Sequence, residues 1–551
     1  MIAEKLRIDF ALPAIPVALA ALVHWPILGR FFRGDDFLHM YHFVNWGYWP
    51  SVLTPFGGHI IFSSKSIFYG LYQAFGVSPL PYFLLALATH LLAVGLLFFT
   101  LRDLTGRTTL ALFGAALWGM SSVNQGSLGW FSVYGHVLTA PCIAWVVRDL
   151  VCVSRSGDHP TRLAVLRWTL LMGIAGSSFG VGLGVALAFP AVAWLMLPAE
   201  LPERLAITRS FALVSVLLVA WYVAEHVYFF SYERDVSFEA TFAHQVSTLR
   251  AVPGFLLDLV SYSAASLMFG ALVASAKDAV ASGIFRETAW VDVLRFSHFV
   301  AASVGVLVVL AMVRGDSGRR RELAALLLLV ASAYALVALG RANSFATAHT
   351  PRYHYLGPLC VTLLLCRTFA CFRWSTLAEI RWVGPVLALA WLACTFGFYA
   401  EAGRKTAVWA GPDDGSRYAA AVAKIEGRAE EIAHESTLYL PNTRFQPGKI
   451  GQPWKFPGSG ALFSITYRDR LWHGKPIHFI ERNPRVVAYV NEQLPGSLVA
   501  ELLVTPEEAT HAKGSDPPAG FQRLDLQKHM ARKARLRRSQ QSAAKKRRRA
   551  Q

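Results

Sequence analysis

Two adjacent carboxylates, Asp35 and Asp36, are the first groups in the sequence whose type and spacing suggest chemistry. Five residues separate them from an apolar stretch at 10–29, where neighbouring negative charges repel each other and gain nothing from lipid. Such a pair either caps a helix or takes part in a reaction, in which a carboxylate can remove a proton from a hydroxyl group as a general base. A helix cap accounts for one of the two acids but not for both.

The residues after this pair allow two further interpretations. A helix beginning at Asp35 would carry His39 and His42 on the same face as the acid, a spacing that can also hold a metal ion. The same aromatic-rich helix would lie along a membrane surface if its role were structural. We therefore expect a helix here and leave these roles open.

Other polar and cationic groups border apolar segments later in the chain. The candidates for substrate binding are His59, Lys65, His90, Trp130, His136, Arg352, Tyr353 and His354. Arg352 is the best candidate for holding a phosphate, because a planar guanidinium fork matches phosphate oxygens. The alternative is an Arg at a membrane interface whose side chain extends to the water. For His90 and His136 the alternative is a buried histidine whose hydrogen bonds are satisfied.

The composition places these groups in a membrane protein. The chain has 551 residues, of which 54% are hydrophobic and 16% charged, more apolar than a soluble domain. We expect an all-α polytopic bundle of about eleven membrane-spanning helices. The apolar runs lie at 11–28, 82–101, 108–120, 134–153, 163–178, 181–197, 210–230, 293–313, 323–339, 356–372 and 383–399.

Basic residues set the expected orientation, because short loops rich in Lys and Arg stay on the cytoplasmic side. Lys5 and Arg7 place the amino terminus in the cytoplasm. The segment 255–273 is apolar enough to cross, but a crossing there would move the cluster at Arg319 outside, so we expect it to be re-entrant or interfacial. The cytoplasmic loops then hold Arg102, Arg107, Arg148, Arg155, Arg162, Arg167, Arg204, Arg209, Arg314, Arg319, Arg320, Arg321, Arg367, Arg373 and Arg381.

Three parts are expected along the chain. Residues 1–400 form the membrane domain. Residues 401–527 read as a small soluble α/β domain outside the cytoplasm, with strands at TLYL, PIHFI and SLVAELLV and helices at 416–435 and NPRVVAYVNEQL. Residues 528–551 form a basic, disordered tail with eleven Lys and Arg and no acid. A nucleic-acid partner is not expected, because the tail follows a membrane protein and lacks interleaved aromatic residues; attachment to anionic lipid is the alternative to a merely solvated tail.

The order of these features in residues 6–399 resembles the GT-C superfamily of integral-membrane glycosyltransferases, in the branch of the protein O-mannosyltransferases. In those enzymes an acidic pair opens the first outer loop, matched by Asp35-Asp36. A His-Leu pair in a span is matched by His90-Leu91, and an Arg-Tyr-x-Tyr sequence at a late span by Arg352 to Tyr355. The chain departs from that branch in its C-terminal module, and no acid accompanies Trp130.

The resemblance implies transfer of a sugar from a polyprenyl-phosphate donor to a hydroxyl group of an acceptor glycan, lipid or protein. Asp35 would be the general base, Asp36 would support the acceptor or the loop, and Arg352 would hold the phosphate. No cofactor is implied, and a divalent metal is compatible with the chemistry but not required. The expected location is the inner membrane of a bacterium, in contact with membrane lipid, with the site facing outside.

Two other classes of protein compete with this interpretation. In a transporter or flippase, the acids would gate ions or protons and Arg352 would hold an anionic substrate. Transporters usually place such charges near the middle of the membrane, in broken helices with repeat symmetry, whereas these lie at the outer rim and no repeat is visible. A membrane scaffold that displays the outer module would not depend on the rim residues at all.

Deleting residues 528–551 should leave folding and sugar transfer nearly unchanged, because a solvated run of charges makes no packed contacts. Thermal unfolding and transfer, both measured in detergent, test this expectation. A truncated protein that folds normally but has lost transfer would show that the tail contributes to function.

Overall fold

The computed structural model describes residues 11–372, apart from 34, 57–58, 234–237, 282–287, 343–347 and 349. Beyond them it describes residues 396, 419 and 423 and four short strands. The chain divides into two compact units. The first comprises Met1–Arg30, Val52–Phe68 and Pro79–Trp409, and the second comprises Phe31–Ser51, Tyr69–Ser78 and Ala410–Gln551.

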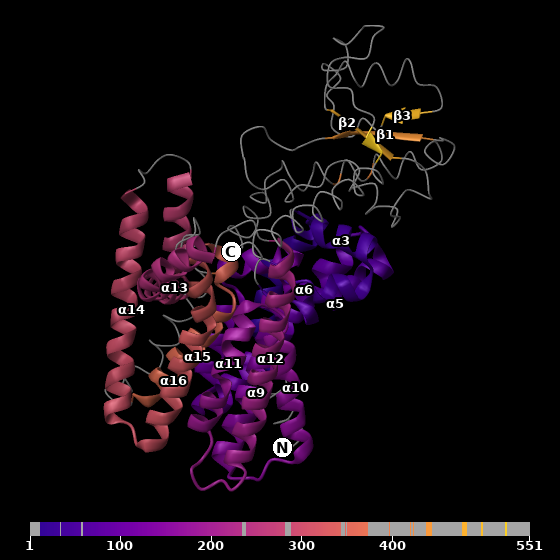
Figure 1. Ribbon diagram of the computed structural model, residues 1–551. Helices are drawn as coiled ribbons and strands as arrows, with labels where there is room; N and C mark the ends of the chain where they lie inside the picture. The colour runs from indigo at the N-terminus through magenta and orange to yellow at the C-terminus, as the bar shows by residue number, and fades with distance from the viewer. Residues whose placement is uncertain are drawn as a thin grey trace. The chain divides into compact units, whose positions relative to one another are not determined.

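The described elements are mostly helices (Figure 1). In chain order they are α2 (Ala14–His24), η1 (Trp25–Gly29), α3 (Asp35–Trp46), α4 (Tyr48–Leu53), α5 (Phe62–Phe75), α6 (Leu80–Thr105), α7 (Thr108–Gly119), η2 (Ser122–Asn124), α8 (Gln125–Leu128), η3 (Phe131–Val133), α9 (Tyr134–Ser156), α10 (Arg162–Gly176), α11 (Gly180–Met196), α12 (Arg204–Glu233), α13 (Phe238–Ala281), α14 (Thr288–Arg314), α15 (Ser317–Arg341), η4 (Pro351–Tyr353) and α16 (Leu356–Cys371).

Six helical segments are long and apolar enough to cross a membrane. They are Leu80–Thr105, Phe131–Ser156, Arg204–Glu225, Leu249–Gly270, Val293–Arg314 and Ser317–Arg341. Shorter apolar helices are Ala14–Gly29, Thr108–Gly119, Gly180–Met196 and Leu356–Cys371. Large apolar side chains such as Leu213 on α12 and Phe299 on α14 are exposed, as expected for surfaces that face lipid. The first unit is therefore a helical bundle of a multi-pass membrane protein.

Local sequence explains where several of these helices begin and end. Asp316 caps α15 by accepting the backbone N–H of Arg319 (2.8 Å), and Thr161 caps α10 by accepting that of Ala164 (3.2 Å). Gly106 and Gly157 end α6 and α9 in the left-handed conformation that other residues rarely adopt. These signals fix turns at the same end of the bundle, because α6 and α9 finish where α10 and α15 begin.

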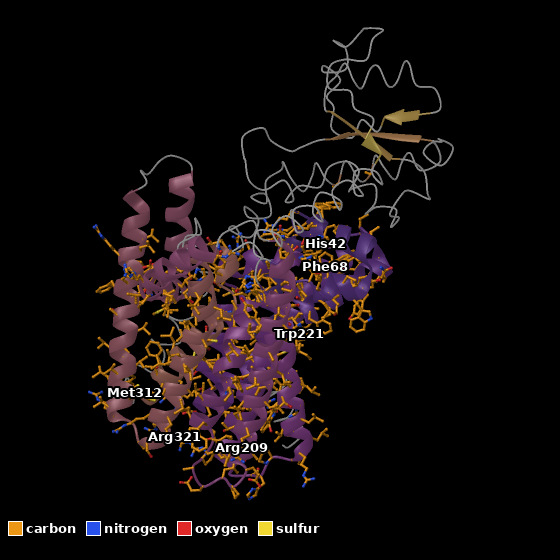
Figure 2. All side chains as sticks on the ribbon, viewed as in Figure 1. His42, Phe68, Arg209, Trp221, Met312 and Arg321 are labelled. Atoms are coloured by element: carbon orange, nitrogen blue, oxygen red, sulfur yellow. The ribbon has the colours of Figure 1, made fainter. Side chains whose placement is uncertain are left out.

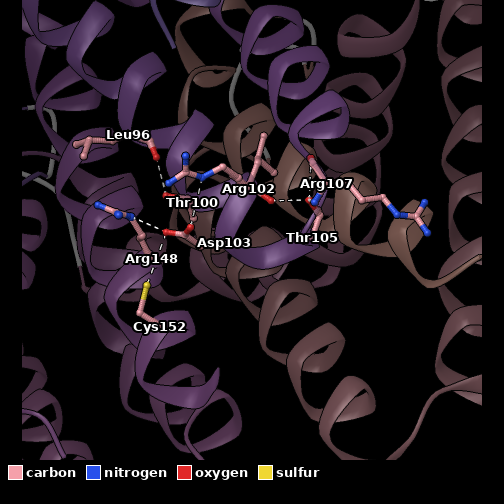
Figure 3. Close-up of polar contacts among 9 residues, drawn as sticks. Leu96, Thr100, Arg102, Asp103, Thr105, Arg107, Arg148 and Cys152 are labelled. Carbon is pink, nitrogen blue, oxygen red and sulfur yellow. Dashed lines mark hydrogen bonds and ion pairs between the residues drawn. The ribbon is translucent and has the colours of Figure 1, made fainter. Parts of the chain in front are cut away.

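Arginine side chains connect the helices at this end of the bundle. We call it the arginine end. Arg148 pairs with Asp103 (2.7 Å) between α9 and α6, as Figure 3 shows. Arg204 and Arg321 both donate to the carbonyl of Trp194 at the end of α11 (2.7 and 3.1 Å). Arg209 and Arg321 lie together at this end in Figure 2. Cations at helix carboxyl ends satisfy free carbonyls and complement the helix dipole.

The connection through α13 begins and ends at the opposite end of the bundle. α12 starts at the arginine end and runs away from it, whereas α14 finishes there, next to the start of α15. Asp258 pairs with His298 (2.8 Å) and the ring of Phe269 lies 5.4 Å from that of Phe296. These contacts are 11 positions apart on α13 (258 to 269) but 2 apart on α14 (296 to 298), so α13 crosses α14 up to Phe269, where the backbone leaves helical geometry and the helix is bent. Figure 1 shows the coils beside the α13 label nearly end-on. The contacts favour the expected re-entrant or interfacial segment, although its composition would also allow a crossing.

The end of the bundle opposite the arginine end carries short, irregular elements. They are η2, α8 and η3 between α7 and α9, the turn at 177–179 between α10 and α11, and η4 before α16. We call it the loop end. It holds every predicted substrate-binding residue of the first unit except His90, which lies within α6.

The second unit contains the helix predicted at Asp35, which is α3. The ring of Phe43 on this helix packs against those of Tyr69 and Tyr72 on the carboxyl half of α5 (5.3 and 5.9 Å). The unit also contains a sheet in the order β3-β1-β2-β4, with β1 (Thr437–Asn442), β2 (Ile477–Glu481), β3 (Ser497–Val499) and β4 (Leu524–Asp525). β1 is parallel to β2 and β3, and β4 is antiparallel to β2.

Three predicted strands are thus present, while β4 was not predicted. Parallel neighbours need long crossover connections, which agrees with a mixed α/β arrangement. The predicted helices at 416–435 and 483–494, the predicted span at 383–399 and the tail at 528–551 lie outside the described residues. The full α/β domain and the complete set of spans therefore stay predictions.

Reporter fusions can test the course of the chain. Fusions after Gly157 and after Gly318 should both read cytoplasmic, because the arginine end holds both sites, and a fusion after Thr350 should read external. If Gly157 and Gly318 report opposite sides, then α13 crosses the membrane and the bundle is threaded differently.

Candidate functional site

The Arg352 guanidinium lies against two aromatic rings at the loop end. Its Cζ atom is 5.6 Å from the centre of the Trp130 ring and 5.2 Å from that of Tyr353. Both distances suit cation–π attraction. Within the described part of the chain, no carboxylate forms an ion pair with Arg352. Its charge is therefore held in place by aromatic faces and stays available to an anion.

A close backbone approach places Arg352 beside the loop that carries Trp130. A Cβ atom at Gly126 of α8 would lie 2.6 Å from the carbonyl carbon of Pro351 and 2.7 Å from the nitrogen of Arg352. Only glycine fits there without displacing η4. The chain segments near 126 and 352 are thus packed backbone to backbone, although they are far apart in sequence.

A second guanidinium contacts the same loop. Arg30 donates to the carbonyl of Gly129 (3.3 Å), and a side chain at Gly129 would collide with it. Arg30 is 7% exposed. Arg30 and Arg352 thus contact consecutive loop residues, Gly129 and Trp130, which concentrates positive charge at the loop end.

Two histidines flank Phe179 in the neighbouring turn. The ring of His59 lies 4.7 Å and that of His136 lies 4.3 Å from the Phe179 ring. His136 is buried, its Nδ1 atom has no hydrogen-bond partner among the described residues, and the charges of His59 and Arg352 act on it. The structure thus brings His59, His136, Trp130, Arg352 and Tyr353 to one region.

Lys65 lies on α5 one turn beyond this region and is 2% exposed. Burial lowers the pKa of its ammonium group to about 7, and the nearby carboxylate of Glu225 opposes part of that shift. The Lys65 ammonium reaches the carbonyl of Thr54 only at 3.5 Å. Lys65 can therefore change its charge near neutral pH, and an anionic ligand would favour its protonated form.

His90 has a structural environment. Its Nε2 atom donates to the carbonyl of Gly119 (3.0 Å), and its Nδ1 atom accepts the hydroxyl of Tyr355 (2.8 Å). His24 donates to the same carbonyl (3.0 Å). Both ring nitrogens of His90 are occupied and the residue is fully buried, so the alternative of a satisfied buried histidine describes it better than substrate contact.

His354 is likewise enclosed. Its ring accepts the hydroxyl of Tyr334 (2.9 Å) and also bonds the carbonyl of Ala348. With no exposed surface, it anchors η4 rather than meeting a ligand.

The acidic pair lies in the second unit, in the first turn of α3. The carboxylate of Asp36 accepts the backbone N–H of Arg33 (3.0 Å), and the Asp36 N–H donates to the Arg33 carbonyl (3.0 Å). The bond to the carboxylate links the start of the helix to the preceding loop and is not an N-cap, because the N–H that Asp36 accepts belongs to Arg33, outside the helix. Asp35 is 8% exposed.

No three His, Cys, Asp or Glu side chains converge as a metal site within the described residues. The spacing of Asp35, His39 and His42 therefore gains no support as a metal centre there. The chain matches no protein-family model, and no curated protein matches it.

Several residues of this region were not anticipated. Arg30 carries a signal that could have found it, because an Arg at the expected outer end of a span runs against the usual distribution of basic residues. Phe179 and Glu225 carry none, since an aromatic residue in a turn and an acid at the end of an apolar helix are both ordinary.

The lowered pKa of Lys65 predicts how stability depends on pH. Between pH 7 and 10.5 the unfolded chain holds a proton on Lys65 that the folded protein has released, so the free energy of unfolding should rise with pH in that window. Relative to Lys65→Met, the gain from pH 7 to 9 should be on the order of 2 kcal/mol. Thermal unfolding across this range is the measurement.

The matched control is Arg320→Met at the arginine end, because guanidinium groups stay charged over this range. Its pH profile should parallel that of the wild type. A Lys65→Met protein whose profile also parallels the wild type would show that Lys65 keeps its proton when folded.

Proposed function

We propose that the protein is a GT-C-like membrane glycosyltransferase, which moves a sugar from a polyprenyl-phosphate donor to a hydroxyl acceptor. The observation that carries this proposal is the Arg352 guanidinium, held on Trp130 and Tyr353 and paired with no described carboxylate. A guanidinium fixed in this way is suited to two parallel hydrogen bonds with phosphate oxygens.

The reaction needs both a cation and a base. The bond between the sugar carbon and the phosphate oxygen breaks, and the polyprenyl phosphate leaves with the electron pair. The acceptor oxygen forms the new bond to that carbon and loses its proton to the base. Arg352 stabilises the negative charge on the departing phosphate. Asp35 is the proposed base, because the Asp36 carboxylate already accepts the backbone N–H of Arg33.

The other residues take supporting roles. Lys65, His59 and His136 add charge and hydrogen-bond donors near the phosphate, whereas His90 and His354 position the segments that carry Trp130 and Arg352. No step requires a metal ion. The sugar and the acceptor, whether glycan, lipid or protein, stay open.

The topology completes the proposal. We place the amino terminus in the cytoplasm, about eleven spans in the membrane, and both the loop end and a C-terminal α/β domain outside. The bacterial inner membrane would supply the lipid-linked donor. Location of the cationic groups at one rim, rather than in the middle of the bundle, favours a transferase over a transporter.

Substitution of Asp35 by Asn should leave a folded protein with transfer reduced by about two orders of magnitude or more. Asn keeps the size of the side chain and can still cap a helix, so a purely structural Asp35 would tolerate it. Asp103→Asn at the arginine end is the matched control and should retain transfer. The assay follows sugar from the polyprenyl-phosphate donor to acceptor in detergent, where no gradient exists to drive transport. Near-normal turnover by Asp35→Asn would remove Asp35 as the base.

Substitution of Arg352 by Lys should raise the KM for the donor strongly, because Lys keeps the charge but lacks the fork. Arg367→Lys, at a residue paired with Glu322 at the arginine end, is the matched control (2.6 Å). Equal donor affinity in the wild type and Arg352→Lys would mean that Arg352 does not grip the phosphate.

A further inference from the structure

Buried polar atoms with no partner gather on the loop that contacts Arg352. Among the described residues, no hydrogen bond reaches Ser121 Oγ, Asn124 Oδ1, Gln125 Oε1, Ser127 Oγ or the Tyr353 hydroxyl. Their side chains are between 0% and 7% exposed, and neither the mechanism above nor the sequence motifs use the first four. A buried polar atom without a hydrogen bond destabilises a protein, so such a concentration calls for a cause.

These atoms belong to segments that are packed together. Ser121, Asn124, Gln125 and Ser127 lie on or beside η2 and α8, and Tyr353 lies on η4, whose backbone meets Gly126. The Asn124 amide nitrogen donates to the carbonyl of Trp118 (2.6 Å), which fixes the amide so that its oxygen points elsewhere. The Asn124 amide is thus oriented by its hydrogen bond. The described side chains packed around the five polar atoms supply no hydrogen-bond partners to them.

All five groups are uncharged, and they border the aromatic and cationic side chains already described. Gly126 brings α8 against Arg352, and Trp130 lies two residues after the end of α8. Hydroxyl and amide groups beside a Trp ring suit a molecule with many hydroxyl groups and no net charge, because each hydroxyl can both donate and accept. A cationic sugar would need a negative charge in the same place, and the five groups provide none.

We infer that the polar groups of η2, α8 and η4 form a subsite for the hydroxyl groups of a neutral sugar, next to Arg352. This inference rests on the proposed function, whose donor carries a sugar on the phosphate. It narrows the donor to an uncharged sugar and assigns Gln125 and Ser127 as specificity residues. The groups are shielded from water, so binding requires side chains over the loop to rotate and association should be slower than diffusion.

The test compares the affinities of three probes in detergent: undecaprenyl phosphate, its glucose ester and its glucosamine ester. The wild type should bind the glucose ester about tenfold more tightly than undecaprenyl phosphate and should gain little from the cationic sugar. The double variant Gln125→Leu/Ser127→Ala should bind undecaprenyl phosphate as the wild type does but lose the gain for glucose. Ser332→Ala, at a buried serine that donates to the Leu329 carbonyl (3.0 Å), is the control and should change neither affinity.

Stability in the absence of ligand gives a second readout. Replacing unpaired polar groups by apolar ones should leave the melting temperature of the free double variant equal to or above that of the wild type. Its rise on adding the glucose ester should be smaller than for the wild type. A lower melting temperature with unchanged affinities would show that the groups serve a water-filled structural network instead.

The outcomes separate this inference from the function on which it rests. If the wild type binds none of the three probes, the proposed function fails. If it binds undecaprenyl phosphate but gains nothing from glucose, or if the double variant keeps the gain, the function stands and the sugar subsite is overturned. Tighter binding of the glucosamine ester than the glucose ester also overturns it.

Discussion

The loop end depends on the carbonyl oxygen of Gly119, a hydrogen-bond acceptor that two helices share. It accepts hydrogen bonds from His24 on α2 and His90 on α6, and His90 in turn accepts the hydroxyl of Tyr355 (2.8 Å) at the start of α16. Trp118 donates to the Tyr355 carbonyl (3.1 Å). The carboxyl end of α7 is thereby fixed to α2, α6 and α16 by buried hydrogen bonds. Loss of these hydrogen bonds would release Trp130 on one side and Arg352 on the other, since Trp130 follows Gly119 closely in the chain and Arg352 closely precedes Tyr355.

The two ends of the bundle use arginine in different ways. At the arginine end, guanidinium groups bond carbonyls and carboxylates, as Arg204 does with Trp194 and Arg367 with Glu322. Arg204 also lies over the Trp194 ring (3.6 Å), so an aromatic contact alone does not distinguish the two ends. Arg352 rests on aromatic rings and forms no ion pair with a carboxylate among the described residues, so its charge is oriented without being neutralised. This contrast is why we assign a ligand to one end only.

Much of the helical architecture could be predicted from sequence, because long apolar runs bounded by Gly106, Gly157 or Asp316 carry strong local signals. The three strands found at TLYL, PIHFI and SLV were also predictable from their apolar and β-branched content. The path of α13 could not be predicted from its composition alone, because that composition permits a crossing of the membrane. Only the arginines on either side of α13 argue against a crossing. β4, with two residues, carries too little pattern to be recognised.

The candidate site was predictable in its residue types but not in its contacts. Arg352, Trp130 and His136 stood out as polar or aromatic groups at the edges of apolar runs. That Gly126 allows η4 to touch α8, or that His90 is occupied at both nitrogens, depends on tertiary packing that no local pattern records. Gln125 and Ser127 were missed for a related reason, because an uncharged polar residue in a turn is ordinary until its burial is known.

The central claim is that Arg352 holds the phosphate of a lipid-linked donor at the loop end. A cryo-EM map of the protein in lipid nanodiscs with added undecaprenyl phosphate tests it most directly. The account predicts density for a phosphate within hydrogen-bond distance of the Arg352 guanidinium, about 3 Å from its nitrogens. A well-resolved map that shows the phosphate at the arginine end, or shows Arg352 with no phosphate beside it, would contradict the account.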